Sequence, residues 1–211
     1  MTRDEISDFG FELLKKLQAG PAQSIFPDDA LHAIFKNAQR VAIEHAESGE
    51  PLYMTFFVHG TKWGAGLGEF ELISPIVFND WPPTEVTKEQ AVFSLGRKFA
   101  QDHPQHIALC LVHVAEVWFT EGSLDTDLSR VTAPSKDPHR TEGIIVSAIT
   151  LDQRMDYSIH ELIRSGGKVS TKQAGEVLHD PSKPTGPRKF GDSLSFGFFR
   201  GYFAGREKAE L

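Results

Sequence analysis

Hydrophobic residues recur at helical spacing in the first quarter of the chain. Over residues 3–19, apolar side chains repeat every three or four positions until a glycine–proline pair ends the pattern. A second and broader apolar stripe spans residues 28–48, where Asp28 and Asp29 suit the first turn of a helix. The pattern therefore predicts two amphipathic helices before residue 50.

The period then changes to the alternation and the apolar runs that are typical of strands. Residues 52–59 are rich in aromatic side chains, and residues 70–73 fit a short strand. The run 107–119 is apolar on both faces, which predicts a central strand. Two further strands, 143–150 and 155–163, are separated by a short polar link that is typical of an antiparallel hairpin.

A third helix is expected to begin after Thr84 or Thr87 and to run to about Gln101. Together these elements indicate an α+β fold with a mainly antiparallel sheet, helices packed on one face of it, and a C-terminal arm. The predicted globular domain spans residues 1–164. Residues 165–191 are rich in glycine and proline, which is typical of a flexible arm.

Residues 192–211 regain a structured pattern and are predicted to be a docking segment. Gly197, Gly201 and Gly205 recur every four residues, so in a helix they would form one groove that another backbone can approach closely. A glycine-rich aromatic strand is the alternative, because each internal glycine costs a helix about 1 kcal/mol relative to alanine. Docking on the chain's own domain and docking on a neighbouring subunit both fit the pattern.

The totals fit one globular protein of 211 residues, 40% hydrophobic and 24% charged. The 22 Lys and Arg residues against 29 Asp and Glu residues give a net charge of −7, which argues against nucleic acid or an anionic membrane as the partner. No apolar stretch has the length of a membrane helix and no secretory signal is visible, so we expect a cytoplasmic protein. The single cysteine excludes an intramolecular disulfide.

Three patterns have residue types found in binding or catalytic sites but are better explained structurally. The glycine-rich link Gly64–Gly68 misses the spacing of phosphate-binding loops, so nucleotide or small-ligand binding there is the weakest hypothesis. His103 and His106 lie in a turn about 20 Å along an extended strand from His113, too far for one metal ion to bridge. Cys110 has apolar neighbours and suits the core. We therefore expect neither a cofactor nor a metal.

Glu116, Arg140 and Glu142 form the constellation that carries the most information. If the strands 107–119 and 143–150 pair antiparallel, Glu116 lies near the sheet end at which Arg140 and Glu142 enter, and Arg140 can donate two hydrogen bonds to its carboxylate. One interpretation is a carboxylate pair, Glu116 and Glu142, that does acid/base work or holds a metal beside Arg140, with His113 or His160 nearby. The other, which we favour, is an ion-paired latch that fixes a long loop at the sheet edge.

The same segment carries a resemblance. A Glu-x-Trp pattern at 116–118, Pro-Ser at 134–135 and an Asp-Pro-x-Arg-x-Glu run at 137–142 resemble a family of uncharacterised bacterial and phage-associated proteins over residues 106–150. The resemblance implies a shared fold and no catalytic residues. The chain departs from the family pattern in its long C-terminal arm.

The function we predict from the sequence is a self-associating interaction or structural protein without catalytic activity. The C-terminal segment would supply part of the interface, and the partner would be a second copy, in a homo-oligomer, or another protein. The alternative is a hydrolase with a carboxylate-containing site near Glu116, Arg140 and Glu142.

Overall fold

The computed structural model describes residues 26–62, 69–78, 87–119, 140–152, 154–182 and 194–209. The helix expected over 3–19 and the link Gly64–Gly68 lie outside these residues. The described helices and strands are, in chain order, α2 (Asp28–Glu47), β1 (Met54–Lys62), β2 (Glu71–Phe78), α3 (Lys88–Asp102), β3 (His106–Phe119), β4 (Thr141–Thr150), β5 (Met155–Ser165), β6 (Lys168–Val177) and α4 (Leu194–Ala209).

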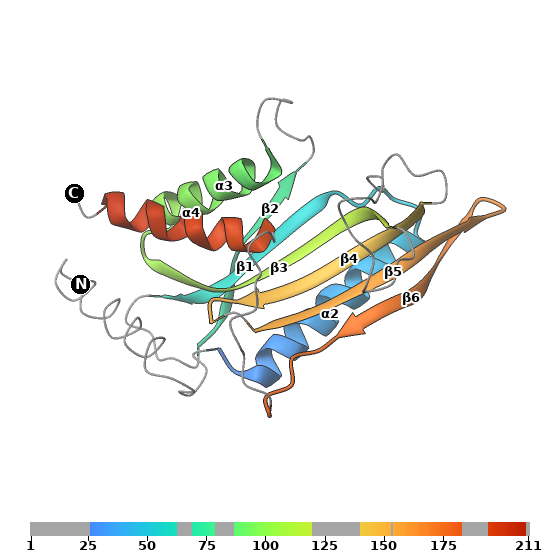
Figure 1. Ribbon diagram of the computed structural model, residues 1–211, viewed down its shortest axis with the longest axis horizontal. Coiled ribbons are helices and arrows are strands. Elements are labelled where there is room, and N and C mark those ends of the chain that lie inside the picture. Colours follow the sequence, from blue (N-terminus) through green and yellow to red (C-terminus); the bar gives the residue numbers. More distant parts are fainter. Residues whose placement is uncertain are drawn as a thin grey trace, which may run out of the picture.

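The strands form one antiparallel sheet in the order β2-β1-β3-β4-β5-β6 (Figure 1). β3 lies between β1 and β4, and its pairing with β4 runs from Cys110 opposite Thr150 to Phe119 opposite Thr141. β4 and β5 form the expected hairpin. The predicted α+β class, the antiparallel sheet and the central position of the strand over 107–119 are therefore confirmed.

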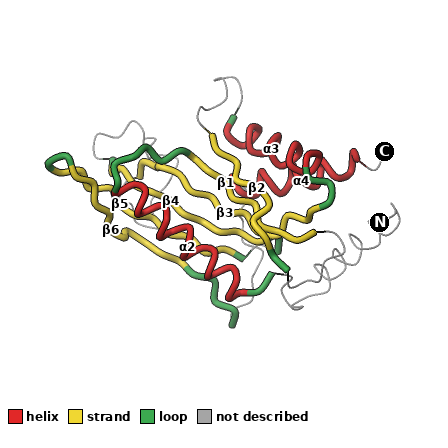
Figure 2. Tube along the Cα trace, turned by 180° about the vertical axis from the view of Figure 1, so that it is seen from behind, coloured by secondary structure: helices red, strands yellow, loops and turns green. Residues whose placement is uncertain are grey.

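Helices cover both faces of the sheet, whereas the sequence analysis expected them on one (Figures 1 and 2). On one face α2 packs against β3–β6, with Phe35 in the same buried cluster as Val112. On the other face α3 and α4 lie over β1 and β3, where Phe99 and Phe198 share a cluster with Leu111. Consecutive β3 residues point to opposite faces, so a strand that is apolar on both sides needs a helical layer on each.

The strand β6 extends the domain into the region that was predicted to be a flexible arm over residues 165–191. Gly166 and Gly167, with φ of +57° and +77°, make the tight turn that joins β5 to β6. Two successive residues with positive φ are what a two-residue hairpin turn requires. The glycine pair therefore marks a hairpin, and β6 pairs along β5 as the edge strand of the sheet.

The C-terminal segment is a helix that docks on its own domain. α4 runs parallel to α3, and the two backbones touch through glycines on both helices. A methyl group at Gly201 would lie 1.8 Å from the carbonyl oxygen of Phe93, and one at Gly96 would lie 1.9 Å from that of Phe198. The four-residue glycine spacing thus serves close helix packing, as the helical interpretation predicted.

Two polar side chains of α4 fix it against the turn between α3 and β3. The Tyr202 hydroxyl accepts from the Ala108 N–H at 3.4 Å and donates to the His106 carbonyl at 3.2 Å. The Arg206 guanidinium donates to the carbonyl oxygens of Pro104, at 2.6 Å, and of His106. These bonds satisfy carbonyls that the end of α3 and the turn leave unpaired. None of the described helices has both the length and the apolar character that crossing a membrane would take.

The contact between α3 and α4 predicts opposite effects for two glycines of one helix. Gly201→Ala should lower the free energy of unfolding by about 1–3 kcal/mol, because its methyl group has to displace the α3 backbone. Gly197→Ala is the matched control, since its nearest neighbour would be the Glu89 carbonyl at 3.5 Å. That change should be neutral or should stabilise by up to about 1 kcal/mol through helix propensity. Urea denaturation measures both, and equal losses would contradict the packing.

Candidate functional site

Glu116, Arg140 and Glu142 come together at one end of the sheet. Trp118 pairs with Glu142 across β3 and β4, which places Glu116 and Glu142 on the same face. The Arg140 guanidinium lies over the Trp118 ring, 4.4 Å from its centroid. Glu116 is exposed, and its carboxylate lies 3.4 Å from the backbone N–H of Leu52. The antiparallel geometry that the sequence predicted is correct for this segment.

The carboxylate of Glu142 has a partner that the sequence analysis did not identify. Arg164, near the end of β5, donates two hydrogen bonds to it at 2.9 and 2.8 Å. These bonds hold the pKa of Glu142 below its usual value. A carboxylate that is ion-paired and readily ionised is a weak general base, so the pair fits a latch better than acid/base work. The catalytic role of Glu116, Arg140 and Glu142 stays a prediction.

The histidines that were considered beside this cluster do not converge on it. His113 faces the α3–α4 side, where its ring stacks on Phe56 with centroids 4.8 Å apart. His160 faces α2, and its Nε2 accepts from the Gln39 amide at 3.0 Å. In the part of the chain that the structure describes, no three His, Cys, Asp or Glu side chains are grouped to hold a metal ion. Burial raises the pKa of Cys110, which keeps it a thiol in the core.

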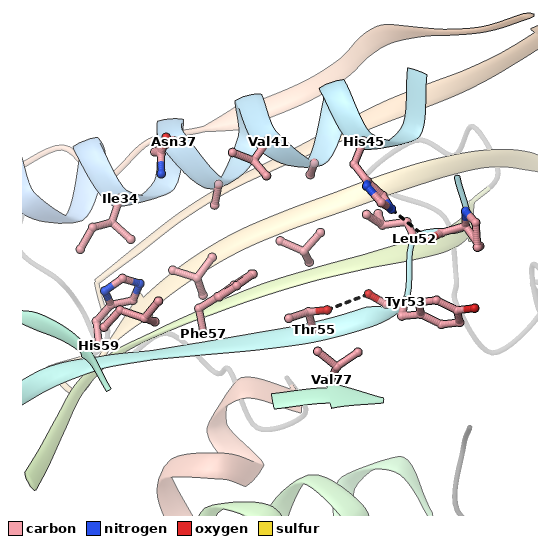
Figure 3. A pocket seen from close by; sticks show the side chains of 16 residues that line it. Ile34, Asn37, Val41, His45, Leu52, Tyr53, Thr55, Phe57, His59 and Val77 are labelled. Carbon is pink, nitrogen blue, oxygen red and sulfur yellow. Dashed lines mark hydrogen bonds between the residues drawn. The ribbon is translucent and has the colours of Figure 1, made fainter. Parts of the chain in front are cut away.

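A cleft between α2 and β1 is the best-formed concave site among the described residues (Figure 3). Its volume is about 400 Å³. α2 forms one wall, β1 and β3 the floor, and β2 the opposite rim. The residues that line it are Ile34, Asn37, Ala38, Val41, Ala42, His45, Pro51, Leu52, Tyr53, Thr55, Phe57, His59, Leu72, Val77, Val112 and Val114.

The path of the chain explains why the cleft exists. α2 lies over β3–β6, so on this face no described helix covers β1 and β2 (Figure 2). Gly49, with φ of +83°, turns the chain after α2, and β1 then returns beside the helix in the opposite direction. The start of α2 is therefore opposite the end of β1. One end of the cleft lies near His59 and the other near His45.

The chemistry of the lining is apolar and uncharged. Among the described residues that line the cleft, none is Asp, Glu, Lys or Arg. The Nε2 of His45 lies 3.1 Å from the Pro51 carbonyl, whereas the His59 ring has no hydrogen-bond partner among the described residues. Burial lowers the pKa of His59, so its imidazole is neutral near pH 7.

Large hydrophobic side chains gather around the mouth of the cleft. Val41, Tyr53, Leu72 and Val77 are between 47% and 52% exposed, and all four also line it. Contiguous exposed apolar surface of this kind marks binding sites on soluble domains. The signal in the sequence was the breadth of the apolar stripe over 28–48, which is wider than packing on the sheet alone requires.

Compared with protein-family models, curated proteins and solved structures, the chain shows no significant match. The resemblance over residues 106–150 therefore stays a prediction. A function has to be inferred from the geometry of the described residues.

Acidification is expected to destabilise the protein through His113. Burial lowers its pKa to about 4, against about 6.5 in an unfolded chain, so the unfolded state takes up the proton first as the pH falls. The neutral His113 therefore makes its full contribution to the free energy of unfolding above about pH 6.5. Below that pH the contribution falls by about 1.4 kcal/mol per pH unit. Urea denaturation should therefore show a loss of about 2 kcal/mol from this group between about pH 7 and pH 5.

His113→Phe keeps a ring beside Phe56 and removes the titrating group. Between about pH 7 and pH 5, the free energy of unfolding of this variant should fall by about 2 kcal/mol less than that of the wild type. The same loss in both proteins would show that His113 is not buried as a neutral imidazole.

Proposed function

We propose that the protein binds a small apolar ligand in the cleft between α2 and β1 and does not act on it chemically. The observation that carries this proposal is a cavity of about 400 Å³ whose described lining residues are mostly apolar and carry no Asp, Glu, Lys or Arg side chain. Ligand pockets span about 300–1,000 Å³ and combine apolar walls with a few polar groups. Here those polar groups are Asn37, His45, Thr55 and His59.

The ends of α2 are held in place, which favours a cleft that is already formed before a ligand arrives. At the start of the helix, the buried guanidinium of Arg154 donates to Asp28 and to the Phe26 carbonyl. At its end, the Glu47 carboxylate accepts from the N–H and hydroxyl of Thr171 at 3.0 and 2.8 Å. A wall fixed at both ends does not need to be ordered on binding, which lowers the free-energy cost of association.

A third attachment holds the middle of α2 from the side away from the cleft. Lys36 Nζ lies 2.5 Å from the Glu176 carboxylate, and Gln39 donates to Glu176 at 2.9 Å and to His160 at 3.0 Å. Both partners of these two side chains are therefore on β5 and β6. Because the polar side of α2 is fixed to these strands, the helix cannot easily shift toward β1 and close the cleft.

Filling the cleft should weaken binding of a neutral apolar probe, N-phenyl-1-naphthylamine. We expect saturable fluorescence enhancement with one site per chain. Ala38→Phe, which places a ring in the cleft, should weaken binding by at least about tenfold, since it displaces apolar contacts worth about 1.4 kcal/mol or more. Ala33→Phe is the control, because Ala33 is an exposed residue of the same helix that does not line the cleft. No enhancement, or equal binding by both variants, would contradict the proposal.

Self-association is the second candidate, and the exposed apolar rim favours it. Val41, Tyr53, Leu72 and Val77 would be buried if a second copy covered this face. The C-terminal helix, which the sequence analysis assigned to the interface, packs on α3 of its own domain, so the rim is the more suitable surface.

Val77→Lys should lower the mass measured by light scattering if copies associate through the rim, because it buries a charge in the contact. Val177→Lys is the matched control: it makes the same change on the other edge strand, at a residue that is 38% exposed. A wild-type mass equal to one chain at all concentrations would remove this candidate.

A further inference from the structure

We infer that the ligand is uncharged and mostly apolar, and that it carries one hydroxyl or carbonyl group, which His59 and Asn37 bind at one end of the cleft. This inference rests on the proposed ligand-binding function and specifies the substrate class of the same site. It follows from the charge of the lining and from the hydrogen-bonding capacity that each end of the cleft leaves open.

The lining excludes a charged head group. A carboxylate or phosphate removed from water needs a paired cation, and a buried ammonium needs an anion. The described residues of the lining offer neither, since no Lys, Arg, Asp or Glu is among them. The half-buried His59 does not replace a cation, because burial disfavours its charged form. The net charge of −7 also repels anions over longer distances.

His59 supplies the free hydrogen-bonding group. Its neighbours across the sheet are Leu72 on β2 and Cys110 on β3, neither of which offers the ring a strong partner. The imidazole is half-buried, points into the cleft beside Ile34, and has no hydrogen bond within the described residues (Figure 3). A neutral imidazole has one donor and one acceptor, so it can bind a hydroxyl in either sense or donate to a carbonyl.

Asn37 completes this end of the cleft from the side of the helix. Its carbonyl oxygen accepts from the Arg40 guanidinium at 3.1 Å, which leaves the amide NH₂ as a donor at the mouth (Figure 3). His59 and Asn37 thus present donors from two elements to one ligand group. At the opposite end some of this capacity is already used, because the Nε2 of His45 lies 3.1 Å from the Pro51 carbonyl and the Thr55 hydroxyl donates to the Tyr53 carbonyl at 3.0 Å.

The test compares three ligands with one chain length, 1-octanol, octane and octanoate, as competitors of N-phenyl-1-naphthylamine on the full chain. The wild type should bind 1-octanol more tightly than octanoate above pH 7. His59→Phe should weaken 1-octanol by about 3- to 10-fold while octane changes less than about twofold, since one neutral hydrogen bond is lost and the apolar contacts remain. His59→Gln, which keeps a donor and an acceptor, should retain most of the affinity for 1-octanol.

His32→Phe is the matched control, because it makes the same change at an exposed residue of α2 that does not line the cleft, and it should leave the ratio of 1-octanol to octane affinity unchanged. An equal ratio in the wild type and His59→Phe, or tighter binding of octanoate than of 1-octanol, would overturn the inference while leaving the cleft as an apolar binding site. Failure of the wild type to bind the probe or any of the three competitors would instead overturn the proposed function, and the inference with it.

Discussion

Arg154 reaches from the turn after β4 into the interior, where its guanidinium bonds two separate segments of the chain. It donates to the Asp152 carboxylate at 3.1 and 3.0 Å, within its own turn. It also donates to Asp28 and to the carbonyl of Phe26, at the start of α2. A guanidinium buried to this degree is tolerated only when its donors are paired, and the loss of one partner of such a group costs about 3–5 kcal/mol. The position of α2 on the sheet, and hence the wall of the cleft, depends on this group.

The cleft is a consequence of uneven cover on the two faces of the sheet. On one face α3 and α4 together cover β1 and β3, so that Phe56 and Val58 are fully buried. On the other face α2 alone has to cover the sheet, and it is attached to the β5–β6 side. The β1 residues that point to this face, such as Phe57, therefore remain partly accessible beside the helix. A single helix is about 10 Å wide, so it cannot cover six strands spaced about 4.8 Å apart.

The local elements were largely predictable from the sequence, whereas the relations between distant residues were not. The apolar run over 107–119 and the hairpin after it are signals of neighbouring residues, and each led to the observed element. The glycine spacing of the C-terminal segment left helix and strand as alternatives, of which the structure has the helix. The strand β6 was missed because Gly166 and Gly167 are equally typical of a linker and of a tight turn. The pairing of Glu142 with Arg164 depends on the register of β4 and β5, which periodicity does not give.

The cleft itself could be anticipated only in part. The stripe on residues 28–48 showed that α2 had more apolar surface than one packed face requires, but not that Ile34 and Val41 would meet β1 across a gap. That depends on where the helix crosses the sheet. The bonds of Arg154 to Asp28 and of Thr171 to Glu47 fix this position, and each joins residues more than 100 positions apart in the chain. The free ring of His59 is likewise a property of the assembled sheet, because its neighbours Leu72 and Cys110 come from two other strands.

The docking of α4 against α3 also has a consequence for how the chain folds during synthesis. Phe56 and Phe99 share a buried cluster with Phe198 and Tyr202, so this half of the core is only partly covered until α4 has left the ribosome. Partly made chains would expose aromatic surface of the kind that promotes aggregation and recruits chaperones. Folding of this face should therefore wait for release of the C-terminal helix, and premature termination before residue 194 should yield a species that proteases remove.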